Sequence, residues 1–192
     1  MTRLHLVRHG PTHAKTMVGW SDLPADLSDT AALRRLHDHL PSEALVISSD
    51  LSRAVDTASA IQGPRRRLPH NPDLREIHFG SWELRGFADI EADDPELAFA
   101  YWDNPGDVRP PQGESWNDVR SRVDAAIDML LAEYTGHDLV IVAHFGVILT
   151  QVQRALDLDG QQTFSYRIDN LSVTDIGLED NTWSVGKINH LP

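Results

Sequence analysis

The sequence contains no cysteine, few basic residues and no long hydrophobic run. The absence of cysteine from all 192 residues excludes disulfide bonds, thiolate nucleophiles and cysteine-ligated zinc sites. No apolar stretch approaches the roughly 20 residues of a membrane-spanning helix. The short apolar run at the N-terminus is interrupted by His5 and Arg8, unlike that of a signal peptide. We therefore expect a cytoplasmic protein without a membrane segment.

Positive charge is scarce as well. The chain has 17 Lys and Arg against 29 Asp and Glu, which gives a net charge of −12 at pH 7. Because proteins that bind nucleic acid need a basic surface for the phosphate backbone, this balance argues against a nucleic-acid partner. The one basic cluster, from Pro64 to Pro69, is typical of a solvated loop. A small anion can still bind wherever a few cations converge.

Strand-like and helical patterns alternate along the chain. Short apolar runs predict strands at Arg3 to Val7, Glu43 to Ser49 and His137 to His144, and helical spacing follows each of them. Two further β-segments near the C-terminus predict a hairpin around residues 179–182. We expect one domain over residues 1–192 with an α/β fold. This would be a three-layer sandwich with a mostly parallel central sheet and helices on both faces.

The segment 79–111 is less regular and contains several helix-breaking pairs. We expect short helices joined by loops, forming an insertion that covers a site like a lid.

Three short polar motifs follow predicted strands, and each contains Arg or His. They are Arg8-His9-Gly10, the stretch from Ser48 to Arg53, and Ala143-His144. Ligands of open α/β sheets bind outside the carboxyl ends of the strands, so we expect these motifs to meet. A guanidinium binds phosphate oxygens bidentately, and a neutral imidazole can act as a nucleophile. The pattern predicts a phosphate pocket.

Cleavage of a phosphate ester also needs a proton for the leaving alkoxide. A carboxylic acid with a raised pKa is the usual source in enzymes. The sequence leaves three candidates for this role, Glu76, Glu83 and Glu114.

The motif LVRHGPT, from Leu6 to Thr12, resembles the opening signature of the histidine phosphatase superfamily, which includes cofactor-dependent phosphoglycerate mutase. Four later blocks resemble those of the same superfamily in the same order. They are SSDLSRAVDTA, LREIHFGSWE, PQGESW and VIVAHFGVI, which begin at Ser48, Leu74, Pro111 and Val140. Together the five blocks extend over most of the chain.

This resemblance implies a role for each matching residue. His9 would be the nucleophile that becomes phosphohistidine, and the carbonyl of Gly10 would fix its tautomer. Glu76 would be the general acid and later the base that activates water. The other phosphate-binding residues implied are Arg8, Arg53 and His144. The resemblance implies no metal and no other cofactor, since these side chains supply the positive charge.

The chain departs from the family pattern at three positions. Many relatives have Glu at the place of Pro11, Asn near the place of Lys15, and Gly at the place of Phe145. The residues that we expect around the substrate are Thr12, Lys15, Trp82, Glu83 and Phe145. The remaining histidines are expected to be hydrogen-bonded structural residues.

The length resembles that of the compact phosphatase branch, and the middle blocks are similar to those of α-ribazole phosphatases. The expected function is a phosphoric monoester hydrolase of the histidine acid phosphatase type, acting on a small phosphorylated metabolite such as α-ribazole 5'-phosphate. A phosphoglycerate mutase-type transferase and an inactive phospho-ligand-binding relative remain alternatives. A homodimer is also left open.

Overall fold

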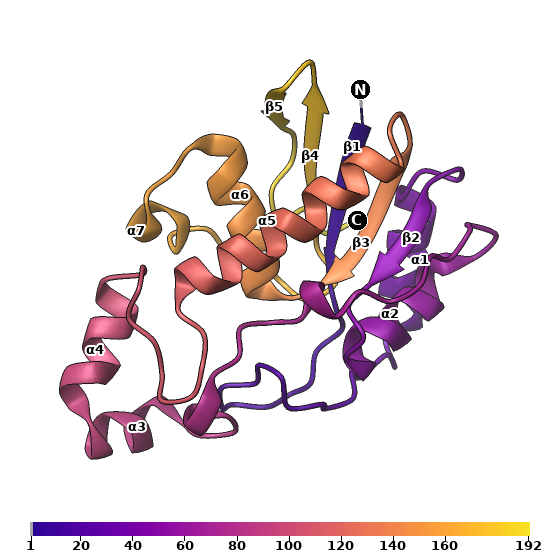
Figure 1. Cartoon of the computed structure of the whole chain (residues 1–192). Helices are drawn as coiled ribbons and strands as arrows, with labels where there is room; N and C mark the ends of the chain where they lie inside the picture. The colour runs from indigo at the N-terminus through magenta and orange to yellow at the C-terminus, as the bar shows by residue number, and fades with distance from the viewer. Residues whose placement is uncertain (1) are drawn as a thin grey trace.

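Residues 2–192, which the computed structural model describes, form a five-stranded sheet with the order β2-β3-β1-β4-β5 (Figure 1). The strands are β1 (Thr2–Arg8), β2 (Leu45–Ser48), β3 (Asp138–Ala143), β4 (Val173–Glu179) and β5 (Thr182–Val185). The three strands predicted at Arg3 to Val7, Glu43 to Ser49 and His137 to His144 are present, within two residues of their expected ends, and the two C-terminal β-segments are present with different ends. The sheet places the ends of β1, β2 and β3 next to one another.

The direction of the strands corrects one prediction. β3 pairs in parallel with β1 and β2, whereas β4 pairs antiparallel with both β1 and β5. The sheet is therefore mixed, and the expectation of a mostly parallel sheet was wrong. The predicted hairpin around residues 179–182 is confirmed, because Asp180 and Asn181 both have positive φ, as a tight two-residue turn requires.

Helices cover both faces of the sheet. α1 (Thr30–His39) and α2 (Ser52–Gln62) pack on one face, where alternate strand residues such as Val46 and Val142 form a core. On the other face, α5 (Trp116–Glu133) and α6 (Phe145–Leu156) pack against Leu6 and its neighbours. The three layers follow from the alternation of side chains along each strand.

Capping residues fix where the helices begin. Asp29 accepts a hydrogen bond from the Ala32 amide at 2.9 Å and begins α1. Ser115 and Asp118 form a capping box at the start of α5. This cap also fixes the position of the loop that precedes α5.

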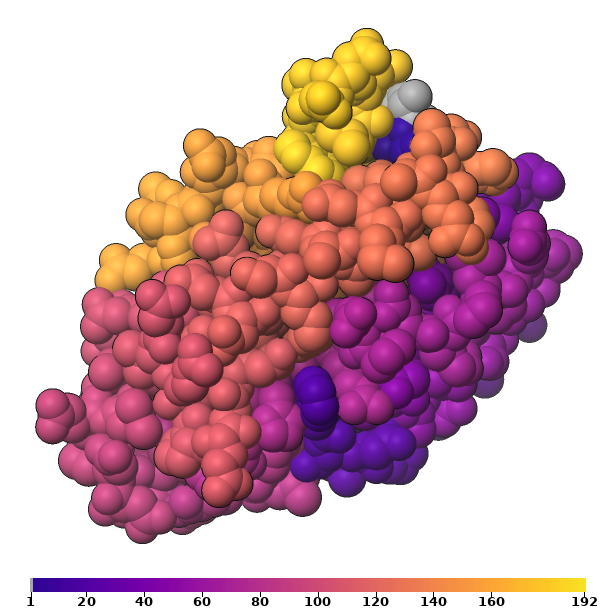
Figure 2. All heavy atoms as spheres, viewed as in Figure 1, coloured from indigo at the N-terminus to yellow at the C-terminus, as the bar shows by residue number. Residues whose placement is uncertain are grey.

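The middle of the chain forms short helices. They are η1 (Pro72–Leu74), η2 (Gly80–Trp82), α3 (Phe87–Asp93) and α4 (Pro95–Asp103), and α7 (Gly160–Thr163) follows much later. Two backbone hydrogen bonds, Leu84 to Met17 and Met17 to Arg85, join this segment to the loop after β1. Figure 2 shows the indigo loop lying against the magenta segment at the surface. In the part of the chain described, none of the helices has the length and apolar character needed to cross a bilayer.

The register of the sheet positions the three polar motifs. Arg8 lies opposite Ala143, and Ser48 lies opposite Val142. The chain continues this alignment past the strands, since the His9 amide donates to the Ala143 carbonyl at 3.1 Å. His9, Ser49 and His144 therefore meet at one edge of the sheet.

Candidate active site

The imidazole of His9 has a defined orientation and tautomer. Its Nδ1 lies 2.6 Å from the Gly10 carbonyl oxygen. Because a carbonyl can only accept, Nδ1 carries the proton and Nε2 presents a lone pair. Burial, with the nearby Arg53 guanidinium, lowers the pKa of His9 to about 3. The ring is therefore neutral at ordinary pH, as a nucleophile must be.

Two arginines face this imidazole. Arg53 is 1% exposed and donates from Nε to Nε2 of His9 at 3.3 Å. Arg8 donates to the Ile168 carbonyl at 2.6 Å, while its buried Nε has no partner among the described residues. Burial lowers the pKa of both guanidinium groups, but arginine keeps its charge in proteins. The site therefore holds two positive charges beside a neutral imidazole.

His144 completes the edge of the sheet. It is fully buried, its ring centroid lies 5.0 Å from that of His9, and its Nε2 lies 2.6 Å from the Ser49 hydroxyl. Its Nδ1 has no hydrogen-bond partner in the described part of the chain. Burial, and then the charges of its neighbours, lower the pKa of His144 well below its usual value. An anion bound beside it would shift the pKa upward.

Glu76 is a buried carboxyl group at the same place. Its Oε1 accepts hydrogen bonds from the Ile77 and Gly146 amides, both at 3.0 Å, and Oε2 lies 3.2 Å from the Gly146 amide. Burial raises the pKa of Glu76, although these amides and both arginines oppose the change. A carboxyl group whose pKa is raised by burial can serve as a proton donor.

The two other candidate acids have different environments. Glu83 accepts hydrogen bonds from the backbone of the loop after β1, and these bonds together outweigh the effect of burial and lower its pKa. Glu114 forms a two-point ion pair with Arg122, with distances of 2.7 and 2.8 Å. Fixed donors occupy the carboxyl oxygens of both groups. Glu76 is thus the candidate whose environment suits proton transfer.

Arg8, His9, Arg53 and Glu76 all line one cavity of about 210 Å³. Its walls come from the loop after β1, from η2 and from the start of α6, and the residues that line it are Arg8, His9, Thr12, Ala14, Thr16, Met17, Val18, Arg53, Glu76, Phe79 and Phe145. Of the expected substrate-contacting residues, the structure therefore brings Thr12 and Phe145 to the cavity. Lys15 is exposed and does not line it, and Trp82 is buried in the core against Tyr101.

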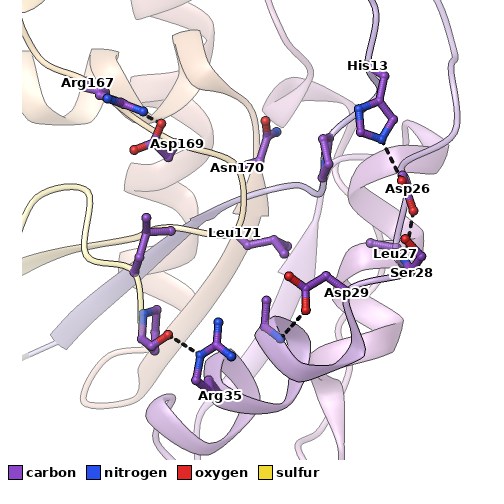
Figure 3. A pocket seen from close by; sticks show the side chains of 14 residues that line it. His13, Asp26, Leu27, Ser28, Asp29, Arg35, Arg167, Asp169, Asn170 and Leu171 are labelled. Atoms are coloured by element: carbon purple, nitrogen blue, oxygen red, sulfur yellow. Dashed lines mark hydrogen bonds and ion pairs between the residues drawn. The ribbon is translucent and has the colours of Figure 1, made fainter.

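A larger cavity, of about 570 Å³, is lined by other residues, among them His13, Arg35 and Arg167 (Figure 3). Its lining has the carboxylates of Asp26, Asp29 and Asp169 against the guanidinium groups of Arg35 and Arg167. His13 lies 2.7 Å from Asp26, and Arg167 lies 2.7 Å from Asp169. The arrangement leaves no concentration of positive charge for a phosphate. Within residues 2–192, no group of three or more His, Asp or Glu side chains is placed to hold a metal ion.

The sequence profile of the histidine phosphatase superfamily (branch 1) matches residues 4–191. The chain belongs to this superfamily. The bifunctional protein Rv2228c of Mycobacterium tuberculosis is 31% identical over 187 residues, which cover 90% of this chain but only 49% of that protein. The chain thus spans about half the length of the first of its curated relatives.

Two other histidine phosphatase relatives match over most of their own length. The adenosylcobalamin/alpha-ribazole phosphatase of Salmonella typhimurium is 30% identical over 174 residues, covering 87% of this chain and 86% of that enzyme. The solved structure of Bacillus stearothermophilus YhfR superposes with a TM-score of 0.91 at 28% identity, covering 100% of this chain and 98% of the other. The similarity therefore includes the whole fold.

Several residues at this site were missed by the sequence reasoning. Thr57 accepts from the Gly10 amide at 2.9 Å, and Asn170 donates to the His9 carbonyl at 2.8 Å. Ser49 and Gly146 contact His144 and Glu76, as described above. Thr57, Ser49 and Gly146 lie inside the matched blocks, which was the available signal. Asn170 lies outside every block, and only the fold brings it to His9.

Proposed function

We propose that this chain is a phosphomonoester hydrolase that acts through a phosphohistidine at His9. The observation that carries the proposal is the orientation of His9: the Nδ1 proton is bound to the Gly10 carbonyl, and the Nε2 lone pair lies beside Arg53 in a cavity shared with Arg8 and Glu76. This geometry suits nucleophilic attack on a bound phosphoryl group.

In the first step, Nε2 of His9 forms a bond to phosphorus while the bond from phosphorus to the ester oxygen breaks. The leaving alkoxide takes the proton of Glu76, whose raised pKa favours the protonated acid. Arg8 and Arg53 stabilise the charge on the equatorial oxygens. The products of this step are the free alcohol, the Glu76 carboxylate and phosphorylated His9.

In the second step, a water molecule attacks phosphorus and the bond to His9 Nε2 breaks. Glu76 accepts a proton from this water, so it returns to its starting state, and inorganic phosphate leaves. The unpartnered Nδ1 of buried His144 gives a further group that can hydrogen-bond to the phosphoryl oxygens once an anion raises its pKa.

For the substrate we propose a small phosphorylated metabolite. The Salmonella relative, named as an adenosylcobalamin/alpha-ribazole phosphatase, supports α-ribazole 5'-phosphate as the first compound to try. We also propose that residues 1–192 act as one catalytic domain. The segment 79–111 would limit access to the cavity, which is supported by its backbone bonds to Met17 and by Phe79 in the cavity wall.

The test is hydrolysis of p-nitrophenyl phosphate by wild type and His9→Ala, with and without EDTA, together with trapping of the phosphoenzyme by a quench into alkaline denaturant and a check of its stability in acid. The proposal expects turnover that EDTA does not change, an acid-labile phosphoenzyme in wild type, and neither in the variant. Full activity of His9→Ala would overturn it. Activity that depends on a bisphosphate primer, without net phosphate release, would replace it with a mutase. Binding of vanadate without turnover on any ester would replace it with a ligand sensor.

A further inference from the structure

Residues 19–21 lie between two charged side chains of opposite sign. On one side, the amides of Gly19 and Trp20 donate to Glu83 at 3.0 and 2.8 Å, and Ser21 donates from its amide and its hydroxyl at 3.3 and 2.7 Å. On the other side, the carbonyl oxygens of Gly19 and Ser21 accept from Arg53 at 2.6 and 2.9 Å. One short length of main chain thus connects the carboxylate to the guanidinium.

This segment has little freedom to move relative to Glu83. A methyl group at Gly19 would overlap the Ile77 carbonyl oxygen and the Glu83 carboxylate, so the backbone approaches both as closely as only glycine allows. Glu83 is itself fixed from the other direction, because its Oε1 also accepts the Phe79 amide at 3.1 Å. A change at this carboxylate therefore moves the carbonyl groups on the far side of the segment.

Those carbonyl groups determine where Arg53 points. The guanidinium donates from its two terminal nitrogens to Gly19 and Ser21, and from Nε to His9. Neutral carbonyl partners orient the group without cancelling its charge, which stays available to a phosphoryl group. Misplacing such a group by about 1 Å can reduce the rate roughly 100-fold.

We propose that Glu83 is a positioning residue for the phosphate-binding group Arg53, acting through the main chain of residues 19–21. This inference rests on the proposed phosphatase function, since it assumes that Arg53 contacts the phosphoryl group. It assigns Glu83 neither a proton-transfer role nor a contact with substrate.

The substitution Glu83→Gln tests this at constant side-chain volume. Oε1 accepts two backbone amides, and Oε2 accepts two amides and a hydroxyl. Glutamine places its NH₂ group against at least two N–H donors in either orientation of the amide. Because two donors cannot bond to each other, the hydrogen bonds at that end of the side chain are lost. Ser115→Ala is the matched control, because it removes a helix cap away from the cavity and lowers stability by a similar mechanism of lost hydrogen bonds.

The experiment measures kcat and KM for p-nitrophenyl phosphate, and Kd for vanadate, in wild type, Glu83→Gln, Arg53→Lys, the double variant and Ser115→Ala. We expect Glu83→Gln to lose roughly 10- to 100-fold in kcat/KM and in vanadate affinity. The double variant should lose little more than Arg53→Lys alone, because both changes act on one group. Ser115→Ala should keep the wild-type values.

Additive losses in the double variant, or unchanged kinetics and vanadate affinity in Glu83→Gln, would overturn the role of Glu83. If Glu83→Gln does not fold, Glu83→Asp takes its place in the same cycle, since it keeps the charge on a side chain one methylene shorter. Wild type that neither hydrolyses the ester nor binds vanadate would instead remove the proposed function itself. The two failures are therefore distinguishable.

Discussion

The buried neutral state of His9 makes the stability of the protein depend on pH in a definite direction. Its pKa is about 3 in the fold, against 6.5 for a free histidine. Between these values the unfolded chain binds a proton that the folded chain does not, so stability falls as the pH falls through this window. Above pH 6.5 neutral His9 makes its full contribution to the free energy of unfolding, and below about pH 3 this contribution does not decrease further.

The magnitude follows from the difference of about 3.5 units between 6.5 and 3. At roughly 1.4 kcal/mol per unit, the whole window is worth about 5 kcal/mol, and a change from about pH 7.5 to about pH 5 costs about 2 kcal/mol. His144 adds a loss of the same sign, because burial lowers its pKa as well. The two histidines therefore make mild acid destabilising, while Glu76, whose pKa is raised by burial, contributes in the opposite direction.

The assay is urea unfolding of wild type and His9→Asn at both pH values. The amide nitrogen of asparagine can replace Nδ1 as the donor to Gly10, yet asparagine does not titrate. We expect the free energy of unfolding of wild type to fall by about 2 kcal/mol more than that of the variant between the two pH values. An equal fall in both proteins would refute the claim that His9 is neutral in the fold.

Three further predictions concern the site. Glu76→Gln should lower kcat/KM, which reports the step that releases the alcohol, by about 100- to 10,000-fold for an alkyl phosphate, and much less for p-nitrophenyl phosphate because nitrophenolate leaves without a proton; steady-state kinetics on both esters checks this. Gly146→Ala should lower both the melting temperature and kcat, since the added methyl overlaps Oε1 of Glu76, as thermal denaturation and the same kinetics would show. Lys15→Ala should change kcat/KM for p-nitrophenyl phosphate less than about twofold, because Lys15 is exposed and outside the cavity.

The order of motifs and strands was sufficient to predict which residues meet. Arg8-His9 and His144 each follow a compact apolar strand, and the carboxyl ends of parallel neighbours lie at one edge of a sheet. The direction of β4 was beyond the same reasoning. The residue types near the C-terminus predict a β-segment there, but not that it pairs with the central β1 in the antiparallel sense.

The choice among the carboxylates shows a second limit. Glu76 and Glu83 lie in one block of sequence, and both have aromatic neighbours. Their environments differ because each carboxylate meets a different distant segment. Residues 19–21 supply amides to Glu83, whereas the start of α6 supplies the Gly146 amide to Glu76. The resemblance pointed to Glu76, and the physical reason becomes visible only when the loop and the helix are placed together.

The net charge of the site balances the charge of the proposed substrate class. Arg8 and Arg53 contribute two positive charges, while burial keeps His9 and His144 neutral. With Glu76 protonated, as the first step requires, the net charge of the site is about +2, which balances a phosphate monoester dianion. A protonated His9 would add charge but lose its lone pair, so the burial that lowers its pKa also preserves its nucleophilicity. The acid sensitivity expected of the fold and the reactivity expected of the site therefore have one cause.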